Sequence, residues 1–233
     1  MLAAGRDAAA PAPAEEAQLL QALGVCQASL GDDRAALDSL LRARVLLERE
    51  GGLDGPGGVR LLVAIAEAYE GVGDNRAALR CLAAAGERHH ADGVCDDAPE
   101  GIRLGLRLGA ARTRCGDLPG AARALDAVEG ALERTGAQQS LQGAMLLMYR
   151  GVLEGCSHPG GGSKACSSRA AAPDVELPLY NQAAQLVQAL GAEASAEGFA
   201  VLARLGDALR ERGDGDGAVA AYGRAADARR DAA

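Results

Sequence analysis

Two stretches of the chain gather residue types that can bind metal ions. They are His89, His90, Cys95, Asp96 and Asp97 in the first stretch, and Cys156, His158 and Cys166 in the second. A structural zinc site needs Cys and His ligands at tight, paired spacings such as Cys-x₂₋₄-Cys, and neither stretch has that pattern. We interpret the first as a helix end, where His is favourable for the helix dipole, and the second as part of a loop. The sequence therefore predicts no metal site and no cofactor.

Motifs for catalysis are also missing from the sequence. There is no Gly-x-Ser-x-Gly elbow and no phosphate-binding loop that ends in Gly-Lys-Ser/Thr. Gly57-Gly58 and Gly160–Gly162 are glycine-rich but lack the strand and lysine context of such loops, so we interpret both as linkers. The His residues have no acid or nucleophile partner in the sequence. We predict that the protein is not an enzyme.

The composition excludes several classes of partner. The chain has 233 residues and a net charge of -8, which argues against a dedicated nucleic-acid surface. No window approaches the ~18 consecutive apolar residues of a membrane span, and residues 1–14 lack the apolar core of a signal peptide, so we expect a disordered leader and a cytoplasmic protein. Six Cys in no scaffold pattern favour a reducing compartment. Few β-branched residues and abundant Ala favour helices over sheets.

A short string recurs along the chain and ends each time in Gly-Asp. The pairs begin at Gly31, Gly73, Gly116 and Gly213, and the first two intervals are about 42 and 43 residues long. A small residue precedes each pair by seven positions: Gly24, Ala66, Gly109 and Gly206. We predict a helix that Gly ends in a left-handed conformation, followed by Asp as the N-cap of a second helix.

The second stretch of each repeat carries one apolar stripe. Its large position is filled by Leu40, Leu82, Leu125 and Tyr222, with small residues four positions earlier and three positions later. Such spacing is typical of a helix with one buried face, which here would pack on the small position of the first helix.

One further repeat is hidden between Gly116 and Gly213. Its first helix is predicted at 141–155, with Gly151 as a small position, and its second at 177–190, with Tyr180 as the large position. Pro178 fits if the second helix begins near Leu177, because proline is tolerated in a first turn. Residues 156–174 are rich in Gly, Ser and Pro, and we interpret them as a mobile loop insertion.

These recurring small and large positions resemble the tetratricopeptide repeat (TPR) family over most of the chain. The repeat of about 42 residues exceeds the usual ~34 and is similar to the long-repeat proteins of the kinesin light chain, cell-polarity adaptor and tonsoku type. The resemblance implies an all-α fold, a right-handed α-solenoid of about five TPR-like helix pairs, formed by residues 15–230 as a single domain.

In that family the first helices line a concave groove that binds a partner. Carried onto this sequence, the partner-binding candidates are Arg60, Arg103, Arg107, Met145, Tyr149 and Arg210. The same register adds Gln18, Gln21, Val25, Ala28, Val63, Glu67, Leu106, Ala110, Thr113 and Asp207 as lining residues. Arg60 and Arg103 occupy equivalent positions in adjacent repeats and could stack along one wall, which predicts a partner with acidic groups. Alternatively, both Arg side chains pair with nearby carboxylates, Glu67 foremost.

The resemblance and the missing motifs together indicate a protein-interaction scaffold or adaptor that binds a peptide or helix of another protein, with no nucleic acid and no membrane. The alternative is a regulatory or sensor module that acts with a larger signalling ATPase or transcription regulator. The sequence leaves the identity of the partner and the oligomeric state open.

Overall fold

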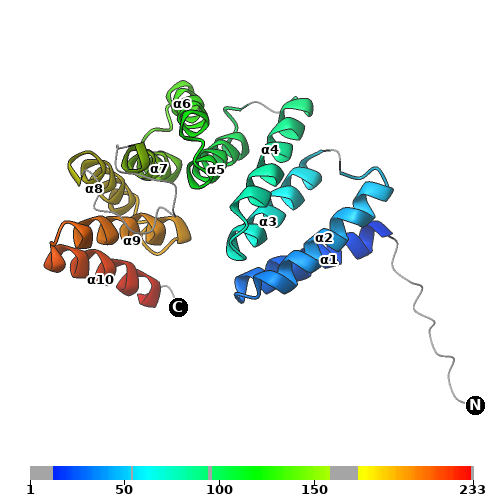
Figure 1. Cartoon of the computed structure of the whole chain (residues 1–233), viewed down its shortest axis with the longest axis horizontal. Coiled ribbons are helices and arrows are strands. Elements are labelled where there is room, and N and C mark those ends of the chain that lie inside the picture. The colour runs from blue at the N-terminus through cyan, green and yellow to red at the C-terminus, as the bar shows by residue number, and fades with distance from the viewer. Residues whose placement is uncertain (1–12, 54, 94–95, 158–172, 232–233) are drawn as a thin grey trace, which may run out of the picture. The chain divides into compact units, whose positions relative to one another are not determined.

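A computed structural model describes residues 13–53, 55–93, 96–157 and 173–231, and every regular element in these ranges is an α-helix (Figure 1). The prediction of an all-α fold is confirmed for this part of the chain. In chain order the helices are α1 (Pro13–Ser29), α2 (Asp33–Arg49), α3 (Pro56–Gly71), α4 (Asn75–Ala91), α5 (Pro99–Cys115), α6 (Leu118–Thr135), α7 (Leu141–Ser157), α8 (Pro173–Ala189), α9 (Ala196–Glu211) and α10 (Gly215–Asp231). None of them is long and apolar enough to cross a membrane.

The helices pack in consecutive pairs, as the repeat pattern predicts. Each odd-numbered helix packs on the even-numbered helix that follows it, which gives five pairs among the described residues. The chain divides into two compact units, residues 1–93 with two pairs and residues 94–233 with three. Within each unit the second helix of one pair also packs on the first helix of the next: α2 on α3, α6 on α7 and α8 on α9. Stacked pairs of this kind are the arrangement of an α-solenoid.

The Gly-Asp turns have the predicted geometry. Gly31, Gly73, Gly116 and Gly213 all have φ between 81° and 85°, the left-handed region that glycine enters without strain. The Asp that follows each glycine caps the next helix. Asp32, Asp74, Asp117 and Asp214 accept a hydrogen bond from the backbone N–H three residues later, at 2.9–3.1 Å.

Within most pairs the two helices meet at a glycine of the first helix. A Cβ atom at Gly24 or Gly109 would lie 2.6 Å from Cγ of Leu40 or Cδ2 of Leu125, and one at Gly151 or Gly206 would lie 2.6 Å from Cε1 of Tyr180 or Tyr222. No side chain fits in these gaps without a shift. The predicted packing of a large residue of the second helix on a small residue of the first is therefore confirmed, and Gly151 with Tyr180 belongs to the repeat that was hidden in the sequence.

Several helix ends differ from the sequence prediction, mostly because proline begins a helix. Pro56 begins α3, so Gly57 and Gly58 form its first turn rather than a linker. Gly58 is buried there, and a Cβ atom on it would collide with the carbonyl oxygen of Leu53, so a glycine is needed for packing.

The other differences concern the leader and the insertion. Pro13 and Ala14 begin α1, Cys156 and Ser157 end α7, and Pro173 and Asp174 begin α8, so the predicted leader and loop are each shorter. As a result Pro178 lies inside α8 instead of in its first turn. Residues 1–12 and 158–172, which include most of both segments, lie outside the described residues, and the single domain over 15–230 stays a prediction.

The glycine contact in the last pair can be tested with two substitutions. Gly206→Ala on α9 places a methyl group against the Tyr222 ring, and overpacking of this kind costs about 1–3 kcal/mol in the free energy of unfolding. Gly223→Ala on α10 is the matched control, because nothing lies within 4 Å of its Cβ position and alanine favours a helix interior by ~1 kcal/mol. In urea unfolding, the free energy of unfolding should fall for Gly206→Ala and rise for Gly223→Ala. Shifts in the same direction would refute the close approach.

The raised pKa of the Tyr180 phenol predicts how the stability of unit 2 changes at high pH. Burial, and secondarily the charge of Glu176, raise the pKa of the Tyr180 phenol well above its usual value. The unfolded chain loses this proton near pH ~10 while the folded chain keeps it, so the free energy of unfolding falls as pH rises above that value. The free energy of unfolding of Tyr180→Phe, measured with urea, should decline less than that of wild type between mildly and strongly alkaline buffer. An equal decline would contradict the assignment.

Candidate functional site

The first helices of unit 2 lie next to one another. α5 packs on α7 and α7 packs on α9, while each of the three also packs on its own second helix (Figure 1). Side chains that point away from the second helices therefore gather on one face, which we call the first-helix face of unit 2. It is where the TPR resemblance places the partner.

The glycine contacts fix the register of this face. Gly109, Gly151 and Gly206 point toward the second helices, so a residue two positions earlier points roughly 200° away, to the opposite side of its helix. These positions hold Arg107, Tyr149 and Arg204, one on each helix. Arg107 and Tyr149 were predicted from the sequence, whereas Arg204 was missed. Its spacing in the sequence, two positions before Gly206, could have identified it.

A second row lies one helical turn closer to the N-termini of the same helices. It contains Arg103 on α5 and Met145 on α7, both predicted as partner-binding residues. Met145 and Tyr149 are partly buried and pack against both hydrophobic clusters of unit 2. Their side chains are therefore held by the core while one edge stays accessible, as a preformed binding surface requires.

Arg103 already has a carboxylate partner, as one of the two sequence hypotheses expected. Its Nη2 lies 3.2 Å from Oε1 of Glu100, and both side chains are more than 60% exposed. The partner is Glu100 rather than Glu67. An exposed pair of this kind is worth ~0–1 kcal/mol, so a better acidic group could replace Glu100 at little cost.

Three of the predicted lining residues cannot reach a partner. Leu106, Ala110 and Thr113 are only 3%, 7% and 4% exposed. Leu106 belongs to the hydrophobic cluster that α5 and α6 share with α7, and the Thr113 hydroxyl donates a hydrogen bond to the carbonyl oxygen of Gly109 at 2.9 Å. Leu106 packs there with Leu146 and Leu153 of α7, in the next helix pair.

Arg60 belongs to unit 1, and Arg210 has another register on α9. Arg60 is exposed on α3 of unit 1, in the register that Arg103 has on α5, and the stacking of the two along one wall stays a prediction. Arg210 lies four residues after Gly206, in the register of Thr113 rather than of Tyr149. It pairs with Asp207 at 3.3 Å, and Asp207 accepts a 2.6 Å hydrogen bond from the Tyr222 hydroxyl, which raises the pKa of that phenol.

The metal-capable residue types do not form a ligand cluster in the described ranges. No three His, Cys, Asp or Glu side chains there are grouped so that they could hold a metal ion. His89 is buried at the end of α4 whereas its neighbour His90 is exposed. Cys95, His158 and Cys166 lie outside the described residues.

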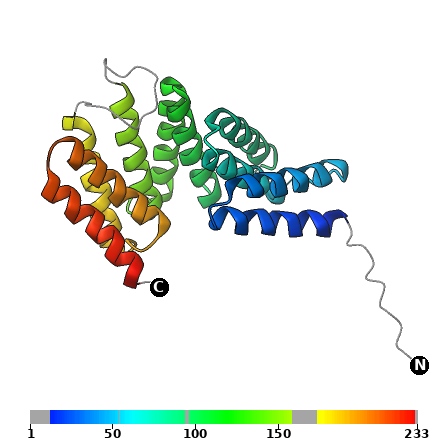
Figure 2. The ribbon, with the colours of Figure 1, turned by 60° about the horizontal axis from the view of Figure 1, so that its bottom comes forward.

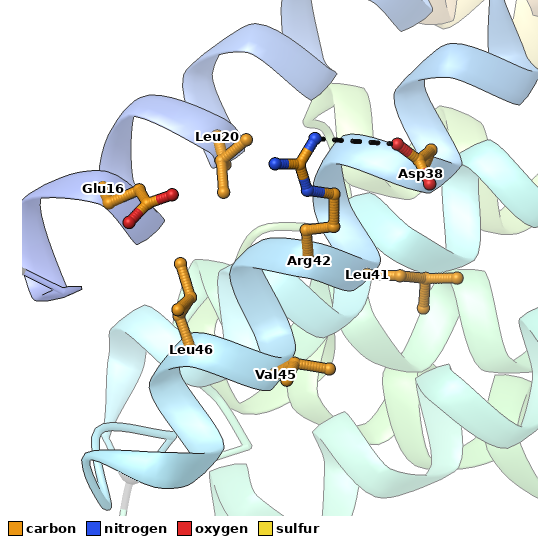
Figure 3. Close-up of a pocket in the computed structure, with 7 residues that line it drawn as sticks. All are labelled: Glu16, Leu20, Asp38, Leu41, Arg42, Val45 and Leu46. Atoms are coloured by element: carbon orange, nitrogen blue, oxygen red, sulfur yellow. Dashed lines mark ion pairs between the residues drawn. The ribbon is translucent and has the colours of Figure 1, made fainter.

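Unit 1 has an open pocket of about 330 Å³ between α1 and α2 (Figure 3). Glu16 and Leu20 line it from α1, and Asp38, Leu41, Arg42, Val45 and Leu46 line it from α2. Leu20 points toward Arg42 and Leu46 across the gap, and a guanidinium nitrogen of Arg42 lies 4.0 Å from a carboxylate oxygen of Asp38. Most of the lining side chains are aliphatic, and the charged side chains of Asp38 and Arg42 are largely exposed.

Solved structures with the same fold are helical-repeat proteins. The nearly identical TPR-like repeats of a candidate kinesin light chain from Podosopora anserina match with a TM-score of 0.60 at 13% identity, covering 94% of this chain and 97% of that one. The Rap conjugation gene regulator of plasmid pLS20, in complex with the Phr* peptide, matches with a TM-score of 0.74 at 12% identity. The match covers 99% of this chain and 60% of the regulator.

A third match is BtubC from P. vanneervenii, with a TM-score of 0.54 at 15% identity over 93% of this chain and 88% of that one. No protein-family model matches the sequence, and no curated protein matches it. At these identities the likeness establishes the fold alone. The fold is that of TPR-like repeat proteins, as the sequence resemblance predicted.

Proposed function

We propose that the protein is a non-enzymatic interaction scaffold, which binds a peptide or helix of a partner protein on its first-helix faces. The observation that carries this proposal is the row Arg107, Tyr149 and Arg204 on three neighbouring first helices of unit 2. Support by analogy comes from two solved Rap structures of similar fold, one in complex with the Phr* peptide and one in complex with a competence and sporulation factor.

The chemistry of the row fits an acidic peptide. Arg presents a planar fork that binds a carboxylate through two hydrogen bonds, and Arg107 and Arg204 flank the Tyr149 ring along the row. Tyr and Met supply apolar contact area, and Tyr adds a polar hydroxyl at the rim. The partner would therefore place an apolar side chain over Met145 and Tyr149, with acidic groups on either side.

Arg60 extends the proposal to unit 1. It is exposed on α3 and makes no ion pair that the described part of the chain shows. A partner of unit 1 would carry an acidic group for Arg60, as the sequence hypothesis expects. Arg210 remains a candidate contact at the C-terminal end of α9.

A selected peptide and a charge-reversed variant test this proposal. We would select binders from a displayed random-peptide library on the wild-type protein and measure the affinity of a recovered peptide by fluorescence anisotropy. Arg103→Glu combined with Arg107→Glu should raise its Kd by more than about a hundredfold, because two charge-assisted contacts are lost and each is worth ~1.5–3 kcal/mol. The selected peptides should be enriched in Asp and Glu.

The control is Arg123→Glu, which makes a charge reversal at an exposed position of α6, a second helix. It should bind the peptide like wild type, and circular dichroism should show that both variants are folded. If the double variant binds as well as wild type, the first-helix face of unit 2 is not the binding surface.

A second function, a peptide-responsive regulatory module, is favoured by the likeness to the Rap conjugation gene regulator. This chain spans 60% and 55% of the two Rap chains that it matches. A module of this kind would change its affinity for a protein partner when the peptide binds. The discriminating measurement is the affinity of this protein for a captured protein partner, with and without saturating peptide. A regulatory module would show two different affinities, whereas a simple scaffold would show the same affinity in both cases.

A further inference from the structure

The face of α1 that points away from the rest of unit 1 is built like an interior surface. Leu19 and Leu23 lie five and one positions before Gly24, whereas Leu20, four positions before it, lines the pocket between α1 and α2. The residues in the same register of α3 are Leu61, Leu62 and Ile65, and those of α9 are Val201, Leu202 and Leu205, and all six are at most 5% exposed. On α1, by contrast, Leu19 is 64% and Leu23 is 49% exposed.

Inside each unit this register is covered in one way. The second helix of the preceding pair packs on it, α2 on α3 in unit 1 and α8 on α9 in unit 2. The two helices follow one another through a short connection and run in opposite directions (Figure 2). The chain therefore shows what fits on such a surface: the outer face of an antiparallel second helix. α1 has no such helix on it among the described residues.

Among the described residues, the outer face of the second helix α10 is also uncovered. Val219 on α10 is 71% exposed, although Leu177 in the same register of α8 is partly buried against the cluster that contains Val201 and Leu202. Ala220 and Ala226 are exposed on α10 as well. Large exposed apolar residues are few in the described chain, and Leu19, Leu23, Val25 and Val219 on these two helices account for half of the eight.

The charges of the two helices are complementary in the antiparallel direction. The first turn of α1 carries Glu15 and Glu16, and the whole helix has no basic residue. The last turn of α10 carries Arg229, which lies over the Phe199 ring, and Arg230, which makes an exposed pair with Asp227. In an antiparallel pair these two ends meet, so carboxylates and guanidinium groups would face one another.

We propose that two copies of this chain associate head to tail, with the outer face of α10 of one copy packed antiparallel on the Leu19 and Leu23 face of α1 of the next. The contact repeats the packing of α2 on α3 and of α8 on α9. The contact is heterologous, because it joins two different surfaces, so each copy in a dimer keeps one of the two surfaces free. Further copies can bind to these free surfaces until the assembly closes into a ring or stops growing.

Sedimentation velocity over a range of concentrations tests the association. The wild-type mass should rise with concentration, and high salt should weaken the rise because the end charges are screened. Leu23→Glu should raise the apparent Kd at least tenfold. Val25→Glu is the matched control, since Val25 is 47% exposed on the same helix but in another register, and it should associate like wild type.

A mixing experiment tests the head-to-tail arrangement. Leu23→Glu blocks α1 and Val219→Glu blocks α10, so each variant alone should be a monomer. An equimolar mixture should form a dimer and nothing larger, because it has one intact α10 face and one intact α1 face. A dimer of Val219→Glu alone would instead show association through two α1 helices and would overturn the proposal. So would a wild-type protein that stays monomeric at every concentration.

Discussion

The close approach of two helices at a residue without a large side chain is the constraint on which each repeat depends. Because Gly109 and Gly206 carry no Cβ, Leu125 and Tyr222 lie directly against the backbone of the partner helix. This contact fixes the rotation of both helices about their axes. Once the rotation is fixed, every other position of the first helix is assigned to the second helix, to a neighbouring repeat or to the open face. In a chain so rich in Ala, close backbone approach also compensates for the small area that each side chain buries.

Ion pairs between consecutive elements add a second level of order in unit 2. Arg150 on α7 reaches both Asp126 and Glu129 on α6. Arg224 on α10 binds Glu193, which lies between α8 and α9. Each pair is partly exposed and contributes little to stability by itself. Their effect is on register, since the guanidinium fork accepts only a narrow range of helix offsets.

The features set by local chemistry could be predicted from the sequence, and those set by neighbouring repeats could not. The Gly-Asp turns depend on a left-handed glycine and a side-chain cap, so Gly73 and Asp74 were sufficient to place one. The start of α8 was placed too late, because Pro178 was taken as its first turn although the helix begins at Pro173. Of the candidate site, Arg103 and Arg107 were identified, but Leu106 and Thr113 were assigned to the open face. The burial of Leu106 depends on residues of α7 in the following helix pair, which no local pattern reveals.

The distribution of the tyrosines gives the two units unequal optical signals. The chain has no Trp and four Tyr, of which only Tyr69 belongs to unit 1. Tyr180 and Tyr222 lie in chiral, ordered contacts against Gly151 and Gly206. The near-ultraviolet spectrum therefore follows the side-chain packing of unit 2, whereas the far-ultraviolet spectrum follows the helices of both units. Comparing the two during unfolding separates a chain that melts as one body from a chain whose units melt in turn, without any label.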